Sequence, residues 1–239
     1  RPDAFAHYDY ARENYTPLLW FFEGFTSYYD DLLLLRAGLI DTATYIRLVG
    51  KSIQAVQQMP GRRVQSVAQA SFDAWLKYYR VDENTPNATV SYYAKGALVA
   101  LCLDLTLRQE GHSLDALMRA LWQRCKAGPM SESDVLDALH ALSGRSYKRE
   151  LQAWVHGTDE LPLARLLPAH GVRIQTETAN FAQRIGLRAV DAPSGIHIKN
   201  VLRDSAAELS SNVWLVAGIL AGILILFSFL IVIARRYKR

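Results

Sequence analysis

The stretch Leu19-Trp20-Phe21-Phe22-Glu23-Gly24-Phe25-Thr26 sets one carboxylate inside a run of aromatic and apolar residues. Burying an isolated charge is costly, so Glu23 needs a partner if its helix points it into a closed site. Two kinds of partner satisfy such a carboxylate, a basic side chain or a metal ion such as zinc. The stretch by itself leaves both interpretations open.

The spacing of apolar residues around this stretch predicts a mainly α-helical protein. A first helix covers 20–35, and Gly38 ends it. Apolar residues at spacings of three and four predict a second helix over 46–56, which Pro60-Gly61 stops. Further helices are predicted over 66–79, 92–108, 114–122, 135–142, 147–155 and 163–167, a loop over 82–88, and short β-like runs over 172–175, 185–190 and 195–202.

A second motif, Ser91-Tyr92-Tyr93-Ala94-Lys95-Gly96, follows later in the chain. In this order the two motifs resemble the gluzincin metallopeptidases, specifically the glycyl aminopeptidase family with its Trp-x-x-Glu-Gly-Phe-Thr signature. The resemblance extends over 1–171 and implies the α-helical half of a gluzincin catalytic domain. Other segments that carry it are Asp9-Tyr10, Glu13-Asn14-Tyr15-Thr16, Ser27-Tyr28-Tyr29-Asp30, Pro60-Gly61-Arg62 and Ser71-Phe72-Asp73-Ala74-Trp75.

The resemblance implies roles for two side chains. Glu23 is the expected third zinc ligand, and the alternative is a structural carboxylate paired with an arginine. Tyr93 is the expected catalytic residue, a phenol that donates a hydrogen bond to the oxyanion of the peptide carbonyl. Tyr92 competes for that role, and a core tyrosine is the plain alternative. Lys95 and Gly96 are expected to be structural and to allow close helix packing.

One feature of the family is missing from this sequence, the His-Glu-x-x-His helix that supplies two zinc ligands and the glutamate that activates water. None of the six histidines has another four positions away. Arg1-Pro2 resembles the end of a basic run that follows this helix in relatives, so the missing ligands are expected upstream. We therefore expect zinc only in a form carrying that helix, and no activity for this chain alone.

Three residues near these motifs have a plain and a functional interpretation each. Asp30 lies two turns along the helix from Glu23 and could hold an outer hydrogen bond, although solvation is the commoner case. Arg62 could meet a substrate carboxylate, with surface or cap use as the alternative. Cys102 and Cys125 give no metal signature, and free thiols are favoured over a disulfide.

The β-like segment 172–209 resembles the start of the PDZ-like domain that follows the peptidase domain in this family. Ile185-Gly186-Leu187 corresponds to its first strand and Asp204-Ser205-Ala206-Ala207 to its groove turn. The resemblance ends after Leu209, and so short a piece cannot close a PDZ fold. We expect it to be poorly ordered or to rest on the helical domain, without binding peptides.

The stretch 213–234 has no charged residue and, as a helix, covers ~33 Å, enough to cross a hydrocarbon core of roughly 30 Å. A linker over 210–212 precedes it and a basic tail over 235–239 follows. This tail predicts a cytosolic C-terminus and an extracytoplasmic domain, periplasmic in a Gram-negative source. Gly218 and Gly222 form a small-xxx-small pattern that would let two such helices pair in a homodimer.

The net charge of +4 comes from the tail, where Arg235, Arg236, Lys238 and Arg239 lie, so no nucleic-acid partner is expected. The sequence therefore predicts the C-terminal portion of a membrane-anchored zinc aminopeptidase that removes small N-terminal residues such as Gly or Ala from peptides. Its expected partners are a peptide substrate and membrane lipid. The alternative is a non-catalytic, membrane-anchored helical interaction module or a truncated remnant.

Overall fold

The computed structural model describes residues 1–175 and 181–210 of the chain. The chain forms two compact units, Arg1–Thr176 and Glu177–Arg239. The described residues are mainly helical with one short β segment, which confirms these two parts of the predicted fold class. The predicted span 213–234, its glycines Gly218 and Gly222, and the basic tail lie outside the described residues.

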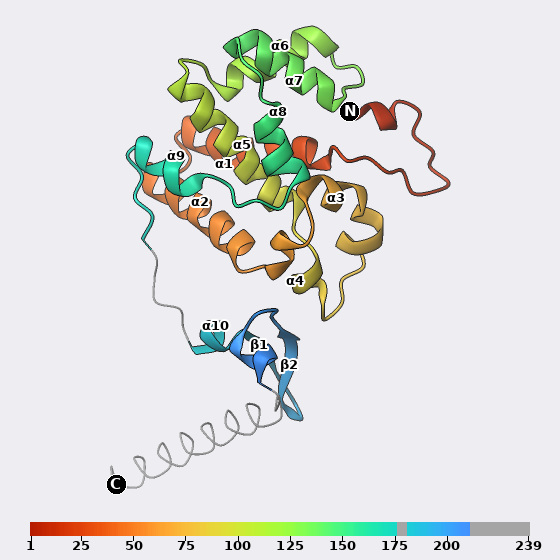
Figure 1. Cartoon of the computed structure of the whole chain (residues 1–239), viewed down its shortest axis with the longest axis vertical. Coiled ribbons are helices and arrows are strands. Elements are labelled where there is room, and N and C mark those ends of the chain that lie inside the picture. Colours follow the sequence, from red (N-terminus) through yellow and green to blue (C-terminus); the bar gives the residue numbers. More distant parts are fainter. Residues whose placement is uncertain (176–180, 211–239) are drawn as a thin grey trace. The chain divides into compact units, whose positions relative to one another are not determined.

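The first unit is a helical assembly joined by short turns (Figure 1). Two 3-10 turns, η1 (Asp3–Phe5) and η2 (Pro60–Arg63), and two π-helical turns, η3 (Ala74–Tyr78) and η4 (Gln152–His156), interrupt it. Its helices are α1 (Leu19–Arg36), α2 (Thr42–Gln57), α3 (Val67–Phe72), α4 (Thr85–Ala88), α5 (Tyr92–Gln109), α6 (Leu114–Cys125), α7 (Glu132–Ser143), α8 (Lys148–Leu151) and α9 (Leu163–Ala169).

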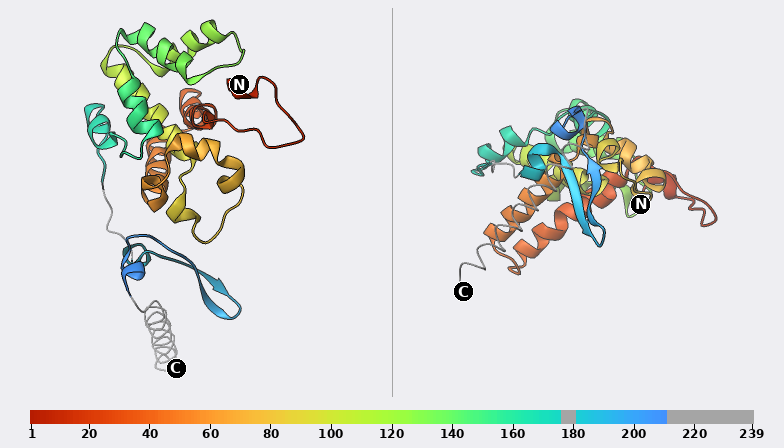
Figure 2. Two further views of the ribbon diagram at one scale, coloured as in Figure 1. Left: turned by 45° about the vertical axis from the view of Figure 1, so that its right-hand side comes forward. Right: turned by 90° about the horizontal axis from the view of Figure 1, so that it is seen from below.

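Helix α5 is the central element of this unit, and α1 packs along it more extensively than any other helix does (Figure 2). From Leu98 to Leu107 every side chain of α5 is buried. The segment Thr85–Gln109 is accordingly the one described helical stretch that is long and apolar enough to cross a membrane, and 78% of its apolar window is buried inside the protein. This burial is typical of the core helix of a globular domain.

Short polar side chains start most of the helices, because the first amides of a helix lack intrahelical acceptors. Asp41 accepts from the Thr44 amide at 2.8 Å, and Ser91 from the Ala94 amide at 3.2 Å. Reciprocal capping boxes begin α3 at Ser66 and α7 at Ser131.

A buried carboxylate ties three of these helices together. Asp104 in α5 is 4% exposed and accepts three hydrogen bonds. The donors are the Tyr28 hydroxyl at 2.7 Å, the Arg108 guanidinium at 2.8 Å and the Leu114 amide at 2.8 Å. Burial and then the charge of Asp104 raise the pKa of Tyr28 far above its ordinary value. Helices α1, α5 and α6 thus share one satisfied polar centre within the core.

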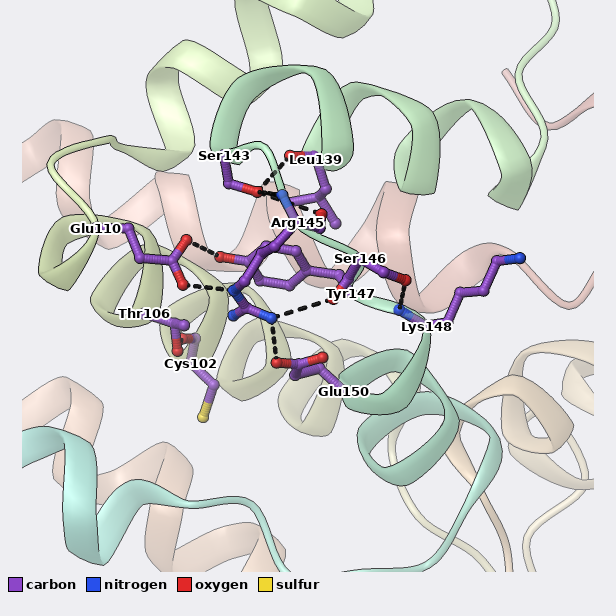
Figure 3. A network of polar contacts seen from close by, with 10 residues as sticks. All are labelled: Cys102, Thr106, Glu110, Leu139, Ser143, Arg145, Ser146, Tyr147, Lys148 and Glu150. Atoms are coloured by element: carbon purple, nitrogen blue, oxygen red, sulfur yellow. Dashed lines mark hydrogen bonds and ion pairs between the residues drawn. The ribbon is translucent and has the colours of Figure 1, made fainter.

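A second network fastens the turn after α7 to the C-terminal end of α5 (Figure 3). The Arg145 guanidinium lies 2.7 Å from Glu110 and 2.6 Å from Glu150. The Tyr147 hydroxyl donates to the other oxygen of Glu110 at 2.7 Å, and Arg145 stacks 3.8 Å over the Tyr147 ring. This arrangement fixes the connection from α7 to α8 against the end of α5.

The second unit contains α10 (Phe181–Ile185), a two-stranded antiparallel sheet and α11 (Ala206–Leu209). Strand β1 (Leu187–Ala192) pairs with β2 (Gly195–Val201), with a bulge between Arg188 and Ala189. Gly186 precedes β1 at a φ of +78°, and a Cβ there would lie 2.1 Å from the Cβ of Ser205. This close approach joins the start of the hairpin to the cap of α11 and requires glycine.

Five predicted segments differ from the structure. The predicted loop 82–88 contains α4, because Pro86, which lacks an amide hydrogen, is favourable in the first turn of a helix. The β-like run 172–175 is not a strand, and the run 185–190 begins in α10. The predicted helices 66–79 and 147–155 each change into a π-helical turn, at η3 and η4. Among the described cysteines, Cys102 and Cys125 are free thiols.

Candidate functional site

Helix α1 carries Glu23 in its second turn. Its first residues have no side-chain cap from Leu18, and instead the Trp20 amide donates to the buried Ser71 hydroxyl of α3 at 2.8 Å. The Trp20 side chain is fully buried and stacks edge-on with Phe21 and Phe25. The aromatic residues of the stretch therefore anchor the helix, and Glu23 is held on its half-buried side.

The Glu23 carboxylate has no ion pair with a basic side chain among the residues that the structure describes. Pairing with an arginine, the alternative raised for this residue, is therefore absent from the described part of the chain. Its neighbour is instead the phenol of Tyr93, whose pKa is raised by burial and further by the nearby Glu23 charge. Glu23 is thus a half-buried carboxylate facing a neutral donor.

Tyr93 lies in the first turn of α5, two residues after the Ser91 cap. Burial raises the pKa of its phenol to about 12, with the nearby Glu23 charge as the next cause. A phenol with this pKa keeps its proton throughout the neutral range and can act as a hydrogen-bond donor. Glu23 and Tyr93, 70 positions apart in the sequence, therefore meet at one place in the fold.

Two glycines bring these side chains together, because α1 and α5 touch through their backbones. A Cβ on Gly24 would lie 2.5 Å from the Gly96 Cα, and one on Gly96 would lie 2.5 Å from the Trp20 carbonyl oxygen. Real Cβ atoms do not approach backbone so closely. Gly24 follows Glu23 directly, and Gly96 is one helical turn after Tyr93, so the crossing point fixes the pair. The expected packing role of Gly96 is confirmed.

Tyr92, the competing phenol, lies on another side of α5. It is 1% exposed, and burial is the main cause that raises its pKa. Tyr93 is partly exposed and adjoins Glu23. A hydrogen-bond donor for a bound peptide has to be accessible, and this favours Tyr93 over Tyr92.

Sequence reasoning missed the aromatic surroundings of this pair. The Tyr78 ring lies 5.6 Å from Tyr93 and 4.8 Å from Tyr92, and 5.4 Å from Tyr79. Tyr78 is the last residue of η3 and Tyr79 follows it directly; the spacing of apolar residues predicted an ordinary helix here. The tyrosine pairs at 78–79 and 92–93 were the available signal, but nothing in the sequence placed one against the other.

Other residues singled out in the sequence lie away from this pair. Asp30 is exposed. The Arg62 side chain is 13% exposed and pairs with Glu160 at 2.9 Å. Lys95 is buried on the opposite side of α5 from Tyr93, beside a cavity. None of the three acts directly on Glu23 in the described contacts.

Among the described residues, no three or more His, Cys, Asp or Glu side chains form a cluster that could hold a metal ion. A metal beside Glu23 would therefore need further ligands from outside the described residues. The half-buried carboxylate of Glu23, without a basic partner, fits the role of a single zinc ligand that other ligands must complete. The adjacent neutral phenol fits a donor beside such a site. The ligand role of Glu23 stays a prediction.

Comparison with known proteins finds a similar solved structure and a matching family model. The chain resembles the crystal structure of an aminopeptidase N family protein from Idiomarina loihiensis, with a TM-score of 0.78 and 36% sequence identity. The match covers 85% of this chain and 38% of that protein, so the chain spans about two fifths of the relative's length. No curated protein matched the chain.

The first part of the chain matches a family model. Residues 1–99 match the model described as M61 glycyl aminopeptidase, and this stretch contains both Glu23 and Tyr93. Over these residues the chain is therefore similar to the M61 glycyl aminopeptidases, in agreement with the resemblance that the two motifs carry.

Proposed function

We propose that this chain supplies the C-terminal part of a zinc aminopeptidase site, with Glu23 as the third metal ligand and Tyr93 as the oxyanion donor. The observation that carries the proposal is the meeting of a half-buried carboxylate lacking any described basic partner with a protonated phenol. The other two ligands would come from a His-Glu-x-x-His helix outside this sequence, consistent with the absence of that motif here.

The role of Tyr93 follows from its protonation state. Because burial and Glu23 raise its pKa to about 12, the phenol holds its proton at neutral pH and can donate to an oxygen that becomes negative. Glu23 would hold the metal by one carboxylate, and its negative charge would moderate the metal's acidity. When bound, zinc would polarise the peptide carbonyl and activate water.

The crossing of α1 and α5 supports this proposal because it holds both groups without loops. Helices place side chains more precisely than loops do, and a transition-state donor loses much of its effect when displaced by about 1 Å. The backbone contact at Gly24 and Gly96 leaves little freedom for either helix to slide. The pair is therefore preorganised by the fold.

We propose that the substrate is the N-terminal end of a peptide, with a preference for a small first residue such as glycine or alanine. The family description, M61 glycyl aminopeptidase, supports this preference. The chain is further proposed to be anchored by 213–234, with the helical unit outside the cytoplasm, the tail over 235–239 in the cytosol, and pairing through Gly218 and Gly222. These membrane features rest on the sequence pattern and lie beyond the described residues.

The test compares this chain with a form extended upstream to include a His-Glu-x-x-His helix, using zinc analysis and hydrolysis of glycyl and alanyl fluorogenic amides. We expect no stoichiometric zinc and no hydrolysis for the chain alone, and both in the extended form. In that form, Tyr93→Phe should reduce kcat by ~10²-fold or more, while Tyr92→Phe should have a much smaller effect.

Two results would contradict the proposal. Normal hydrolysis by the chain alone would show that the site is not divided in this way. Full activity of Tyr93→Phe in the extended form would remove the phenol from the chemistry. Failure to find any form with the histidine motif would favour the alternative, a non-catalytic anchored module.

A further inference from the structure

A cavity of 430 Å³ lies on the side of α5 away from Tyr93. Residues 93 and 95 are two positions apart on a helix and so point about 200° apart, which separates this cavity from the Glu23–Tyr93 pair. Its walls come from α2, η2, α5, the segment 158–161 and α9. The apolar part of the lining consists mainly of Ile53, Val56, Leu98, Leu161, Leu163 and Ala164.

Lys95 is the unusual member of this lining. It is only 2% exposed, yet it makes no hydrogen bond or ion pair with any residue in the described parts of the chain. Lysine is almost never so buried without a partner, because removing the ammonium from water is costly. Burial lowers the pKa of Lys95, and the charge of Glu160 acts in the opposite direction. The ammonium thus lines a cavity with its donors unused.

The other charges around the cavity do not satisfy it. Glu160 already accepts from Arg62, at 3.0 Å from Nε and 2.9 Å from Nη2. Asp159 also lines the cavity but is solvent-exposed and forms no described ion pair with Lys95. The charged lining therefore consists of Arg62, Lys95, Asp159 and Glu160, and Lys95 is the buried member of this set that makes no described hydrogen bond or ion pair.

We propose that this cavity binds a small organic carboxylate with an apolar chain, whose carboxylate accepts hydrogen bonds from Lys95. A volume of 430 Å³ is within the range of small-molecule sites, ~300–1,000 Å³. The apolar side chains of α2, α5 and α9 match a hydrocarbon chain. A single free ammonium suits a single negative charge, and the nearby Asp159 and Glu160 would disfavour a dianion such as phosphate.

This inference is independent of the proposed peptidase site, because Glu23 and Tyr93 do not line the cavity. It also changes the role of Lys95, which the sequence suggested was structural. A buried cation that only supported helix packing would be better replaced by an apolar side chain of the same length. Retaining the ammonium is explained if a ligand pairs with it.

The experiment uses the whole chain in a mild non-ionic detergent, with hexanoate as the probe and uncharged hexanamide as its matched control. Isothermal titration calorimetry should detect hexanoate binding, with hexanamide at least 10-fold weaker. Lys95→Met should weaken hexanoate binding by roughly 10- to 100-fold, the range expected for loss of a charged hydrogen bond. Lys51→Met, which removes an exposed lysine of α2, should leave binding unchanged.

A second readout separates ligand binding from a structural role. Hexanoate would favour the charged form of Lys95, so titrations at pH 9 in buffers of different ionisation enthalpy should show net proton uptake in the wild-type chain. Lys95→Met should show none, and its far-UV circular dichroism should match the wild type. Equal binding of hexanoate and hexanamide, unaltered hexanoate binding by Lys95→Met, or no hexanoate binding up to ~10 mM overturns the proposal.

Discussion

The replacement Gly96→Ala tests the helix crossing on which the candidate site depends. The added methyl carbon would lie 2.5 Å from the Trp20 carbonyl oxygen, 2.9 Å from the Gly24 Cα and 3.2 Å from the Trp20 carbonyl carbon. Ordinary carbon contacts are ~3.5–4.0 Å, so the helices must separate by about 1 Å. All three neighbours are backbone atoms, and no side-chain rotation can relieve the contact.

The size of the effect follows from two opposing terms. Overpacking a tight interior costs ~1–3 kcal/mol, and a backbone clash belongs at the upper end of that range. Alanine in place of glycine within a helix gains about 1 kcal/mol. We therefore expect Gly96→Ala to lower the free energy of unfolding by about 2 kcal/mol, with a fall in Tm of ~4–8 °C for a unit of this size.

Gly50 provides the matched control, because it lies inside α2 and a Cβ there meets no atom within 4 Å. Gly50→Ala should raise stability by up to about 1 kcal/mol. Both variants can be followed by thermal unfolding of the whole chain, with far-UV circular dichroism in a mild detergent. If Gly96→Ala proves as stabilising as Gly50→Ala, the backbone contact between α1 and α5 is wrong.

Three further predictions concern polar groups in the first unit. Asp104→Ala should cost about 3 kcal/mol in urea unfolding, since it leaves the Tyr28 hydroxyl and the Leu114 amide without their acceptor; a loss below about 1 kcal/mol would contradict the network. Ser131→Ala should cost about 1 kcal/mol by removing the cap of α7, and an unchanged Tm would refute it. Burial lowers the pKa of Lys95 below its ordinary value of 10.5. At a pH below the pKa of the folded state, Lys95 is charged in both states and destabilises the folded state to the full extent. This destabilisation decreases as the pH rises towards 10.5. Lys95→Met should thus be more stable than wild type at neutral pH, with a gap that narrows on the alkaline side; a pH-independent gap would argue against the buried charge.

The parts of the fold that the sequence predicted are those with a strong local signal. Helices α1, α2 and α5 are rich in apolar residues, α2 and α5 also begin at polar caps, and the structure places all three close to the predicted bounds. The segment at Thr85 was missed because four residues with proline and asparagine look like a loop. The run 172–175 was mistaken for a strand, since β-branched residues alone do not provide a pairing partner.

The candidate site was predictable only as far as its motifs reached. Glu23 and Tyr93 were found from their sequence context, but their meeting depends on the contact between Gly24 and Gly96. The cavity at Lys95 could not be predicted, because its walls come from elements more than 100 residues apart and the periodicity of one helix does not identify its neighbours. Lysine side chains are rarely buried, so the residue type at position 95 also argued against a place inside the protein.

The central claim, that Glu23 is a zinc ligand, is tested most directly by zinc affinity in a form that includes the His-Glu-x-x-His helix. Competition with a chelator should show that Glu23→Ala weakens zinc binding by more than ~100-fold, since loss of even an outer hydrogen-bond partner costs ~10- to 100-fold. Asp30→Ala, an exposed carboxylate on the same helix, should leave the affinity unchanged. Equal zinc affinity of Glu23→Ala and wild type would contradict the account.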